Sequence, residues 1–312
     1  MIHPYSFEIS SACKILGYSR QSYYKVAAGK PEIEDEVIRL AELNLRKVRK
    51  TCPSQGCRSM YEEFGDQLPI GRDKSIALFM ALGYRVKYPK RYGRATQSGT
   101  REFSNLLVQK DVNGVNQVWQ ADMAHYLYGD TKLYTIYITD VYNQEIVGYG
   151  AYDSNHALNY RAVMRKAISR AVGNGVKLKG MIHHSDGGKQ YESEVYKELC
   201  NRHGILQSMC MYSYENPYAE KTNDLINSGY LNYWKPKKLE ELRKCQKKAV
   251  ADHNKKRRKK VLNGLSPLQY KSMLQTQPSM AYTLKLKPRN PEQPRKRVPQ
   301  NVNKLTIHKT EL

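Results

Sequence analysis

The sequence predicts an α/β protein in which small all-α modules of helix-turn-helix type precede a mixed five-stranded sheet with flanking helices. Residues 1–113 contain short segments whose apolar residues recur at helical spacing. From about residue 114, segments rich in Tyr, Val and Ile alternate in the manner of strands. The later alternation of helical and strand-like segments is typical of a sheet that carries helices on its faces.

The N-terminal segment, residues 1–30, predicts two short helices. ISSACKILG has helical spacing, Gly17 ends that helix, and Ser19 can cap the second helix, RQSYYKV. This outline is that of a helix-turn-helix, and it predicts DNA contacts by Ser19, Arg20 and Gln21. An ordinary helical hairpin is the alternative interpretation.

Residues 31–95 predict a second helical module that also resembles a DNA-binding unit. EDEVIRLAELNLRKV is amphipathic, and CRSMYEEFGDQL and RDKSIALFMALGY supply two further helices. Residues 96–113 are basic, rich in Gly, Ser and Thr, and without periodicity. We therefore expect an interdomain linker that lies on DNA.

Residues 114–234 predict the sheet and its helices. Strands in QVWQADMAHYLY, KLYTIYITDVYN and EIVGYGAYD are separated by hairpin turns at Gly129–Asp130 and Asn143–Gln144. A long helix, ALNYRAVMRKAISRAVG, follows them. GMIHH, SEVYKELCNRHG and LQSMCMY then predict a strand, a helix and a strand, and a last helix extends from about Pro217 to Trp234.

The C-terminal part is predicted to be a helical basic extension of this core, residues 235–274, followed by a basic Pro-rich tail, residues 275–312. KLEELRKCQKKAVADHN has an apolar stripe and a charged face. The tail contains two candidate strands, YTLKLK and KLTIH, although its composition equally suits a segment that orders only on binding.

The net charge of +23 is unevenly distributed. Residues 1–113 carry +7 (19 Lys/Arg less 12 Asp/Glu), residues 114–234 carry −1 (11 less 12), and residues 235–312 carry +17 (22 less 5). Basic arms of this kind attract polyphosphates such as nucleic acid by counterion release. A solvated basic tail is the alternative for the run HNKKRRKK.

The composition argues against a membrane protein and a disulfide framework. No apolar stretch approaches the length of a membrane span, and the N-terminus lacks an apolar h-region, so we expect a cytoplasmic protein without a membrane partner. The six cysteines are scattered. Cys52 and Cys57 could seed a zinc site, but no paired histidines lie near them, and reduced thiols are the preferred interpretation.

Three acidic residues lie at the edges of predicted elements: Asp122 in VWQADMAHY, Asp186 in IHHSDGGKQY and Glu220 in YENPYAEKTND. Carboxylates are rarely left in hydrophobic segments without a partner. If the first and fourth strands are neighbours, the two aspartates meet at one end of the sheet and the following helix brings Glu220 over them. Such a set suits two Mg²⁺ ions, with Mn²⁺ as a substitute, acting on a phosphodiester. A turn or salt-bridge role is favoured for the nearby Asp140.

These residues resemble the DDE triad of retroviral-type integrases and transposases, whose cores have a ribonuclease H-like fold. The intervals are 64 residues (186 − 122) and 34 residues (220 − 186). VWQADMAHY, IHHSDGGKQY, ENPYAE, ITDVYNQEIVGY and HNKKRRKKVLNGLSPLQY look like transposases of the bacterial insertion sequence 3 group, encoded by their second reading frame. SACKILGYSRQSYYKV resembles their N-terminal segment. The resemblance covers roughly residues 8–275. It implies that residues 114–234 are the integrase catalytic core, with all three acids as catalytic metal ligands.

The neighbours of the triad have expected supporting roles. His184 and Ser185 could orient Asp186 or touch phosphate, and Gly187 allows a sharp turn beside the metal. Asn216 occupies the place of the family's Asn and is expected to brace the loop or the helix start. Further DNA contacts are predicted for the nearby lysines and the C-terminal basic run: Lys189, Lys221, Lys255, Lys256, Arg257, Arg258, Lys259 and Lys260.

The resemblance implies a DNA transposase that cuts element ends and joins them to target DNA by attack of a 3′-hydroxyl. The implied partners are double-stranded DNA, further copies of this chain on that DNA, and an upstream-frame product fused to it or assisting it, in the nucleoid of a bacterium. One departure is Asn227, where relatives often carry a Lys that reaches the DNA end; Lys221 or Lys189 could substitute for it. A ribonuclease H-like nuclease without strand transfer, and a catalytically silent DNA-binding regulator, are the alternatives.

Overall fold

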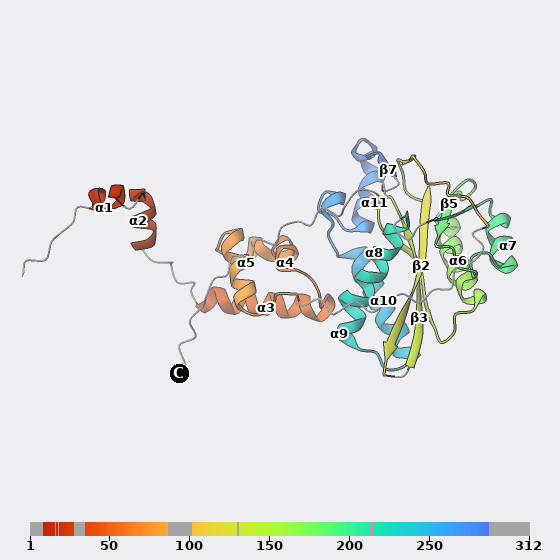
Figure 1. Ribbon diagram of the computed structural model, residues 1–312, viewed down its shortest axis with the longest axis horizontal. Helices are drawn as coiled ribbons and strands as arrows, with labels where there is room; N and C mark the ends of the chain where they lie inside the picture. Colours follow the sequence, from red (N-terminus) through yellow and green to blue (C-terminus); the bar gives the residue numbers. More distant parts are fainter. Residues whose placement is uncertain are drawn as a thin grey trace, which may run out of the picture. The chain divides into compact units, whose positions relative to one another are not determined.

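The computed structural model describes residues 9–15, 17, 19–27, 35–86, 102–129, 131–211 and 215–286. The chain forms two compact units, Met1–Tyr88 and Pro89–Leu312, each of which has its own packing (Figure 1). Among the described helices, none combines the length and the apolar character that a bilayer crossing requires.

The first unit is helical throughout its described residues. α1 (Ile9–Ile15) and α2 (Arg20–Ala27) are joined through Gly17, whose φ of +71° favours glycine. The remaining elements are α3 (Asp35–Thr51), α4 (Cys57–Phe64), the short 3₁₀ helix η1 (Gly65–Gln67) and α5 (Arg72–Ala81). They enclose an apolar core that includes Leu45, Met60, Phe64 and Phe79. The predicted helices of this unit are therefore present.

The second unit is built on a five-stranded sheet of order β4-β3-β2-β5-β6. β2 (Val118–Tyr128), β3 (Thr131–Asp140) and β4 (Ile146–Tyr152) form an antiparallel meander. β5 (Ile182–Ser185) is parallel to β2, and β6 (Leu206–Met209) is parallel to β5. This mixed topology confirms the predicted fold class, including the contact between the first and fourth strands of the core.

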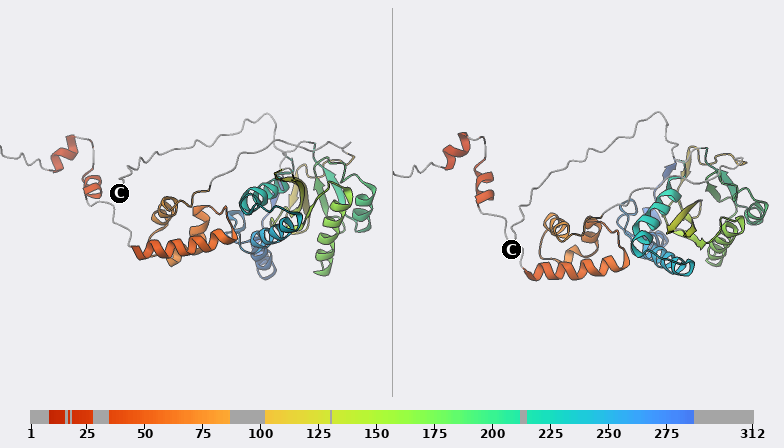
Figure 2. Two further views of the ribbon diagram at one scale, coloured as in Figure 1. Left: turned by 90° about the horizontal axis from the view of Figure 1, so that it is seen from below. Right: turned by 60° about the horizontal axis from the view of Figure 1, so that its bottom comes forward.

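Helices cover both faces of this sheet (Figures 1 and 2). α6 (Ala157–Gly173) and α7 (Glu194–Arg202) pack on one face, over a core that contains Trp119, Ala121 and Ile138. α8 (Pro217–Ile226) and α10 (Leu239–Lys255) contact β2, β3 and β4 on the other face. Because strand residues alternate between faces, Asp122 points toward the α8 side, opposite to its neighbour Ala121.

The helix predicted from about Pro217 to Trp234 is present over its whole length, but it is not α-helical throughout. After α8, the chain makes a π-helical segment, η3 (Asn227–Leu231), and then a single turn, α9 (Asn232–Trp234). Lys235 ends it in a left-handed conformation with φ of +48°. Asn227 therefore lies in a π-helical segment, a form that is frequent at functional sites.

The C-terminal extension belongs to the second unit. After α10 come the short 3₁₀ helix η4 (Lys260–Leu262), α11 (Pro267–Thr276) and η5 (Pro278–Met280). β7 (Leu284–Leu286) then pairs antiparallel with β1 (Lys110–Val112). Two segments predicted to lie outside the core, the linker and the first candidate strand of the tail, thus pair with each other. KLTIH lies outside the described residues.

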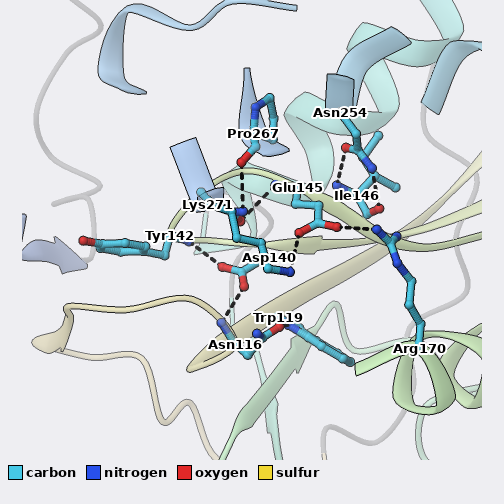
Figure 3. Close-up of polar contacts among 11 residues, drawn as sticks. Asn116, Trp119, Asp140, Tyr142, Glu145, Ile146, Arg170, Asn254, Pro267 and Lys271 are labelled. Atoms are coloured by element: carbon cyan, nitrogen blue, oxygen red, sulfur yellow. Dashed lines mark hydrogen bonds and ion pairs between the residues drawn. The ribbon is translucent and has the colours of Figure 1, made fainter. Parts of the chain in front are cut away.

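The turn between β3 and β4 is tied down by Asp140, one of its buried acids (Figure 3). Its two carboxylate oxygens accept hydrogen bonds from the backbone N–H groups of Asn116 and Tyr142. Burial raises the pKa of Asp140 to about 6, and these two N–H donors partly oppose the shift. Asp140 therefore has the turn role that was favoured for it.

A second buried acid, Glu145, fixes the same turn to helices on both faces (Figure 3). One carboxylate oxygen forms an ion pair with Arg170 of α6 at 2.8 Å, and the other forms an ion pair with Lys271 of α11 at 3.0 Å. Asn254 of α10 bonds both the N–H and the carbonyl of Ile146, at 2.9 and 3.0 Å. The C-terminal extension therefore holds the β3–β4 turn rigidly in place.

Candidate active site

The register of two parallel strands brings Asp122 and Asp186 together. Ala121 of β2 is directly paired with Ser185, the last residue of β5, so Asp122 on β2 and Asp186 just after β5 are neighbours. Adjacent strands lie about 4.8 Å apart. Residues 64 positions apart in the sequence are thus placed side by side by backbone pairing alone.

The two aspartates disfavour each other's charge. Burial, reinforced by the neighbouring Asp186 carboxylate, raises the pKa of Asp122, and the Glu220 carboxylate adds to the same effect. Burial also raises the pKa of Asp186, which the Gly188 backbone N–H moderates. This site concentrates negative charge where water is partly excluded, and a cation would relieve that cost.

Glu220 comes from the first turn of α8, whose start is fixed to β2. Asn216 Nδ2 donates to the Ala121 carbonyl at 2.9 Å, and the Tyr218 backbone N–H donates to Gln120 Oε1 at 2.9 Å. The Glu220 side chain is exposed, in contrast to the buried Asn216. Asn216 Oδ1 is buried and has no hydrogen-bond partner among the residues that the structure describes, so the helix start retains an unsatisfied acceptor.

Asn223 is a site residue that the sequence predictions missed. It lies three residues after Glu220, on the same face of α8, and its Nδ2 donates to Asp122 Oδ2 at 2.9 Å. The other Asp122 oxygen accepts the Met123 backbone N–H at 2.8 Å. Asn223 therefore orients the Asp122 carboxylate, and the helical spacing from Glu220 was the signal that could have identified it.

The donor chemistry of the site suits a hard divalent cation. Within the described ranges, no three His, Cys, Asp or Glu side chains are already gathered closely enough to hold one metal ion. Asp122 and Asp186 nevertheless supply adjacent carboxylate oxygens, and the exposed Glu220 lies within electrostatic range of them. Oxygen donors of this kind are those that Mg²⁺ and Mn²⁺ prefer. The residues present therefore fit such an ion.

The residues around Asp186 have different environments. At Gly188, a Cβ atom would lie 3.1 Å from Asp186 Oδ1, so a larger residue would crowd the carboxylate. His184 is fully buried in β5, where its Nδ1 bonds Ser208 Oγ at 2.9 Å, and Ser185 is also buried. His184 and Ser185 are thus packed inside the sheet, and their expected roles of orienting Asp186 or touching phosphate stay predictions. Lys189 is exposed beyond the turn.

The remaining predicted DNA contacts lie in two places. Ser19, Arg20 and Gln21 are exposed at the start of α2, in the first unit. The basic run at the end of α10 is mixed: the side chains of Lys255, Lys256, Arg258 and Lys260 are exposed, whereas those of Arg257 and Lys259 are half-buried. Lys221 is exposed on α8, next to Glu220.

Comparisons with known proteins agree with this architecture. The family described as "Integrase core domain" matches residues 112–212. An insertion element IS600 31 kDa protein of Shigella sonnei is 28% identical over 83% of this chain and 97% of its own length. The transposase for insertion sequence element IS904 of Lactococcus lactis is 30% identical over 52% of this chain and 59% of its own.

Among solved structures, the HTLV-2 integrase catalytic core domain in complex with magnesium overlaps 53% of this chain and 98% of its own length. It is 20% identical, with a TM-score of 0.41. The assignment of the fold rests on the strand order and directions described above. The integrase core domain and the insertion-sequence relatives, together with this sheet topology, support an insertion-sequence transposase of the DDE integrase superfamily.

Proposed function

We propose that Asp122, Asp186 and Glu220 are the catalytic metal ligands of a DNA strand-transfer reaction at the ends of a mobile element. The observation that supports this most directly is the pair of adjacent carboxylates, whose mutual repulsion is not balanced by a cationic side chain in the described part of the chain. Two Mg²⁺ ions, or Mn²⁺ in their place, would neutralise phosphate charge there and activate a water or a 3′-hydroxyl as nucleophile.

The protein's own residues provide orientation and access. Asn223 and the Met123 N–H hold the two oxygens of Asp122 in fixed directions. Asn216 fixes the start of α8, which carries Glu220 in its first turn. Gly188 leaves the Asp186 carboxylate uncrowded. The site is thus positioned by regular elements on three sides, as precise phosphoryl chemistry requires.

The partners that we propose are double-stranded DNA, as element end and as target, and further copies of this chain assembled on it. Relatives in the insertion sequence 3 group suggest an upstream-frame product as a helper, and a bacterial nucleoid as the place of action. Arg20 of α2 and the exposed cations of the 255–260 run are the proposed DNA contacts. They are suited to counterion release from phosphates.

A strand-transfer assay on candidate terminal repeats tests this function. Asp186→Asn and Glu220→Gln should abolish Mg²⁺-dependent cleavage and joining while leaving DNA binding nearly intact. Glu194→Gln is the matched control, because Glu194 is also exposed in the first turn of a helix but lies in α7. Full activity in either site variant would contradict the proposal.

The same assay separates the alternatives when a pre-cut DNA end with a free 3′-hydroxyl is supplied. Joined products indicate a transposase. Cleavage without joining under all metal conditions would instead indicate a ribonuclease H-like nuclease. Binding without either reaction would indicate a DNA-binding regulator.

A further inference from the structure

The basic run 255–260 contains one lysine whose environment differs from that of the exposed ones. Lys259 Nζ donates to Gln144 Oε1 at 2.8 Å, and its side chain is half-buried. Its backbone is also fixed, because its N–H donates to the Leu265 carbonyl at 3.0 Å within an isolated antiparallel bridge. The Lys259 ammonium is thus held at a defined place on the second unit.

The partner of Lys259 is equally fixed. Gln144 lies in the β3–β4 turn, is 8% exposed, and adopts a left-handed conformation with φ of +58°. His253 Nε2 contacts the Gln144 carbonyl at 2.9 Å, and the adjacent Glu145 is ion-paired to both Arg170 and Lys271. The turn therefore provides a rigid base for the ammonium, and little ordering entropy remains to be lost when an anion binds.

Positive charge accumulates around Lys259. α8 packs against α10, and Lys221 of α8 and Arg257 at the end of α10 are both close enough to repel the Lys259 ammonium. Burial, followed by this repulsion, lowers the pKa of Lys259 to about 7. Neither Lys221 nor Lys259 forms an ion pair with an acid among the described residues. Such an arrangement is costly without an anion.

The cluster of Lys221, Arg257 and Lys259 is separated from the carboxylates by a length of a few nucleotides. Asp122 is paired with Tyr137 on β3, and β3 continues for three residues, about 10 Å, before the turn that holds Gln144. Lys221 directly follows Glu220 on α8. Because successive phosphates of one DNA strand rise by about 3.4 Å, this separation corresponds to a few nucleotides.

We propose that Lys221, Arg257 and Lys259 together bind one phosphodiester of the DNA backbone, a few nucleotides from the phosphate that reacts at the carboxylates. This inference rests on the proposed function, because it takes DNA as the substrate. It assigns two roles to the basic run 255–260. Arg257 and Lys259 belong to the phosphate site, whereas the exposed lysines attract DNA at long range.

The test is the salt dependence of binding to a fluorescent 30-base-pair duplex of arbitrary sequence, measured by anisotropy without divalent metal. Lys221→Ala and Lys259→Met should each reduce the slope of log affinity against log salt by about 0.9, the value for one phosphate contact. The double variant should reduce it by about the same amount, because both residues hold one phosphate. The control is Lys166→Met, which removes an exposed charge from α6 on the opposite face and should leave the slope unchanged.

Equal reductions of the salt slope in Lys221→Ala, Lys259→Met and Lys166→Met would overturn the phosphate site and leave only diffuse attraction. Additive reductions in the double variant would have the same meaning. Unfolding temperatures verify that the variants fold, and if Lys259→Met fails to fold, Lys221→Ala and Arg257→Gln are compared with Lys166→Met by the same criterion. The binding assay requires no catalysis. Strand transfer retained in Asp186→Asn would therefore contradict the proposed function but would leave these slopes as they are. Slopes that do not change in the lysine variants would contradict the phosphate site but not the proposed function.

Discussion

Two pairs of acids on the same sheet have opposite surroundings. At the β3–β4 turn, Asp140 accepts two backbone N–H groups and Glu145 is ion-paired to both Arg170 and Lys271. Beside α8, Asp122 and Asp186 are neighbours. The groups that donate hydrogen bonds to their carboxylates are the Asn223 side-chain amide and backbone N–H groups. The first pair is satisfied by the protein, and the second is not.

This difference indicates which acids stabilise the fold and which are kept for a ligand. A buried carboxylate with full partners contributes to the native structure, whereas removal of one partner leaves an uncompensated charge. A carboxylate pair that raises its own pKa lowers stability, and such strain is expected where function requires it. Substitutions in the two regions should therefore have opposite effects on stability and on activity.

The largest effect is expected for the unsatisfied pair. Asp122→Asn should reduce strand transfer by at least about 10³-fold, because several kcal/mol of charge stabilisation would be lost. Its unfolding temperature without metal should stay the same or rise, because repulsion with Asp186 is relieved. Strand-transfer rates and thermal melts measure the two quantities, and a strongly destabilised variant would place Asp122 among the structural acids.

The satisfied pair should behave in the opposite way. Glu145→Ala should lower the free energy of unfolding by about 3 kcal/mol, because Arg170 and Lys271 lose their shared partner. Urea denaturation measures this change. Glu198→Ala, which removes an exposed ion pair with Arg202, is the control and should cost less than about 1 kcal/mol. Equal costs in the two variants would remove the distinction between the regions.

A smaller effect is expected for Asn223. Asn223→Ala should raise the Mg²⁺ concentration for half-maximal activity by about tenfold, as is usual when a residue that orients a metal ligand is removed. Asn201→Ala, at an exposed position of α7, should leave that concentration unchanged. A fall in maximal rate without any shift in the Mg²⁺ requirement would argue against an orienting role.

The smallest effect concerns pH. The pKa of Lys259 is about 7 in the folded protein and 10.5 in the unfolded chain. The free energy of unfolding therefore falls as pH drops from about 10.5 to 7, because the unfolded chain binds the proton first. Below pH 7 the residue is charged, and DNA affinity should rise by less than about tenfold between pH 8 and pH 7. Lys259→Arg, which stays protonated, should lose this part of the pH dependence; an unchanged profile in that variant would contradict it.

Local patterns allowed most of the fold to be predicted. The helix predicted as ALNYRAVMRKAISRAVG is α6, Ala157–Gly173, because its apolar spacing and terminal glycine are contiguous in sequence. YTLKLK was a candidate strand and contains β7, but the β1–β7 pairing could not be predicted, because Lys110–Val112 lies in the predicted linker and no local signal marks it as the partner strand. The helical spacing from Glu220 marked the position of Asn223, but its hydrogen bond to Asp122 is a long-range contact that no local pattern indicates.

The most direct test of the central claim is a metal titration of thermal stability. Mg²⁺ and Mn²⁺ should raise the unfolding temperature of the wild-type protein, with a stabilisation of about 1.4 kcal/mol when the ion is at ten times its Kd. Asp186→Asn should lose this rise, whereas Glu194→Gln should keep it. The same rise in wild type and Asp186→Asn, or no rise in the wild type, would contradict the assignment of Asp122 and Asp186 as metal ligands.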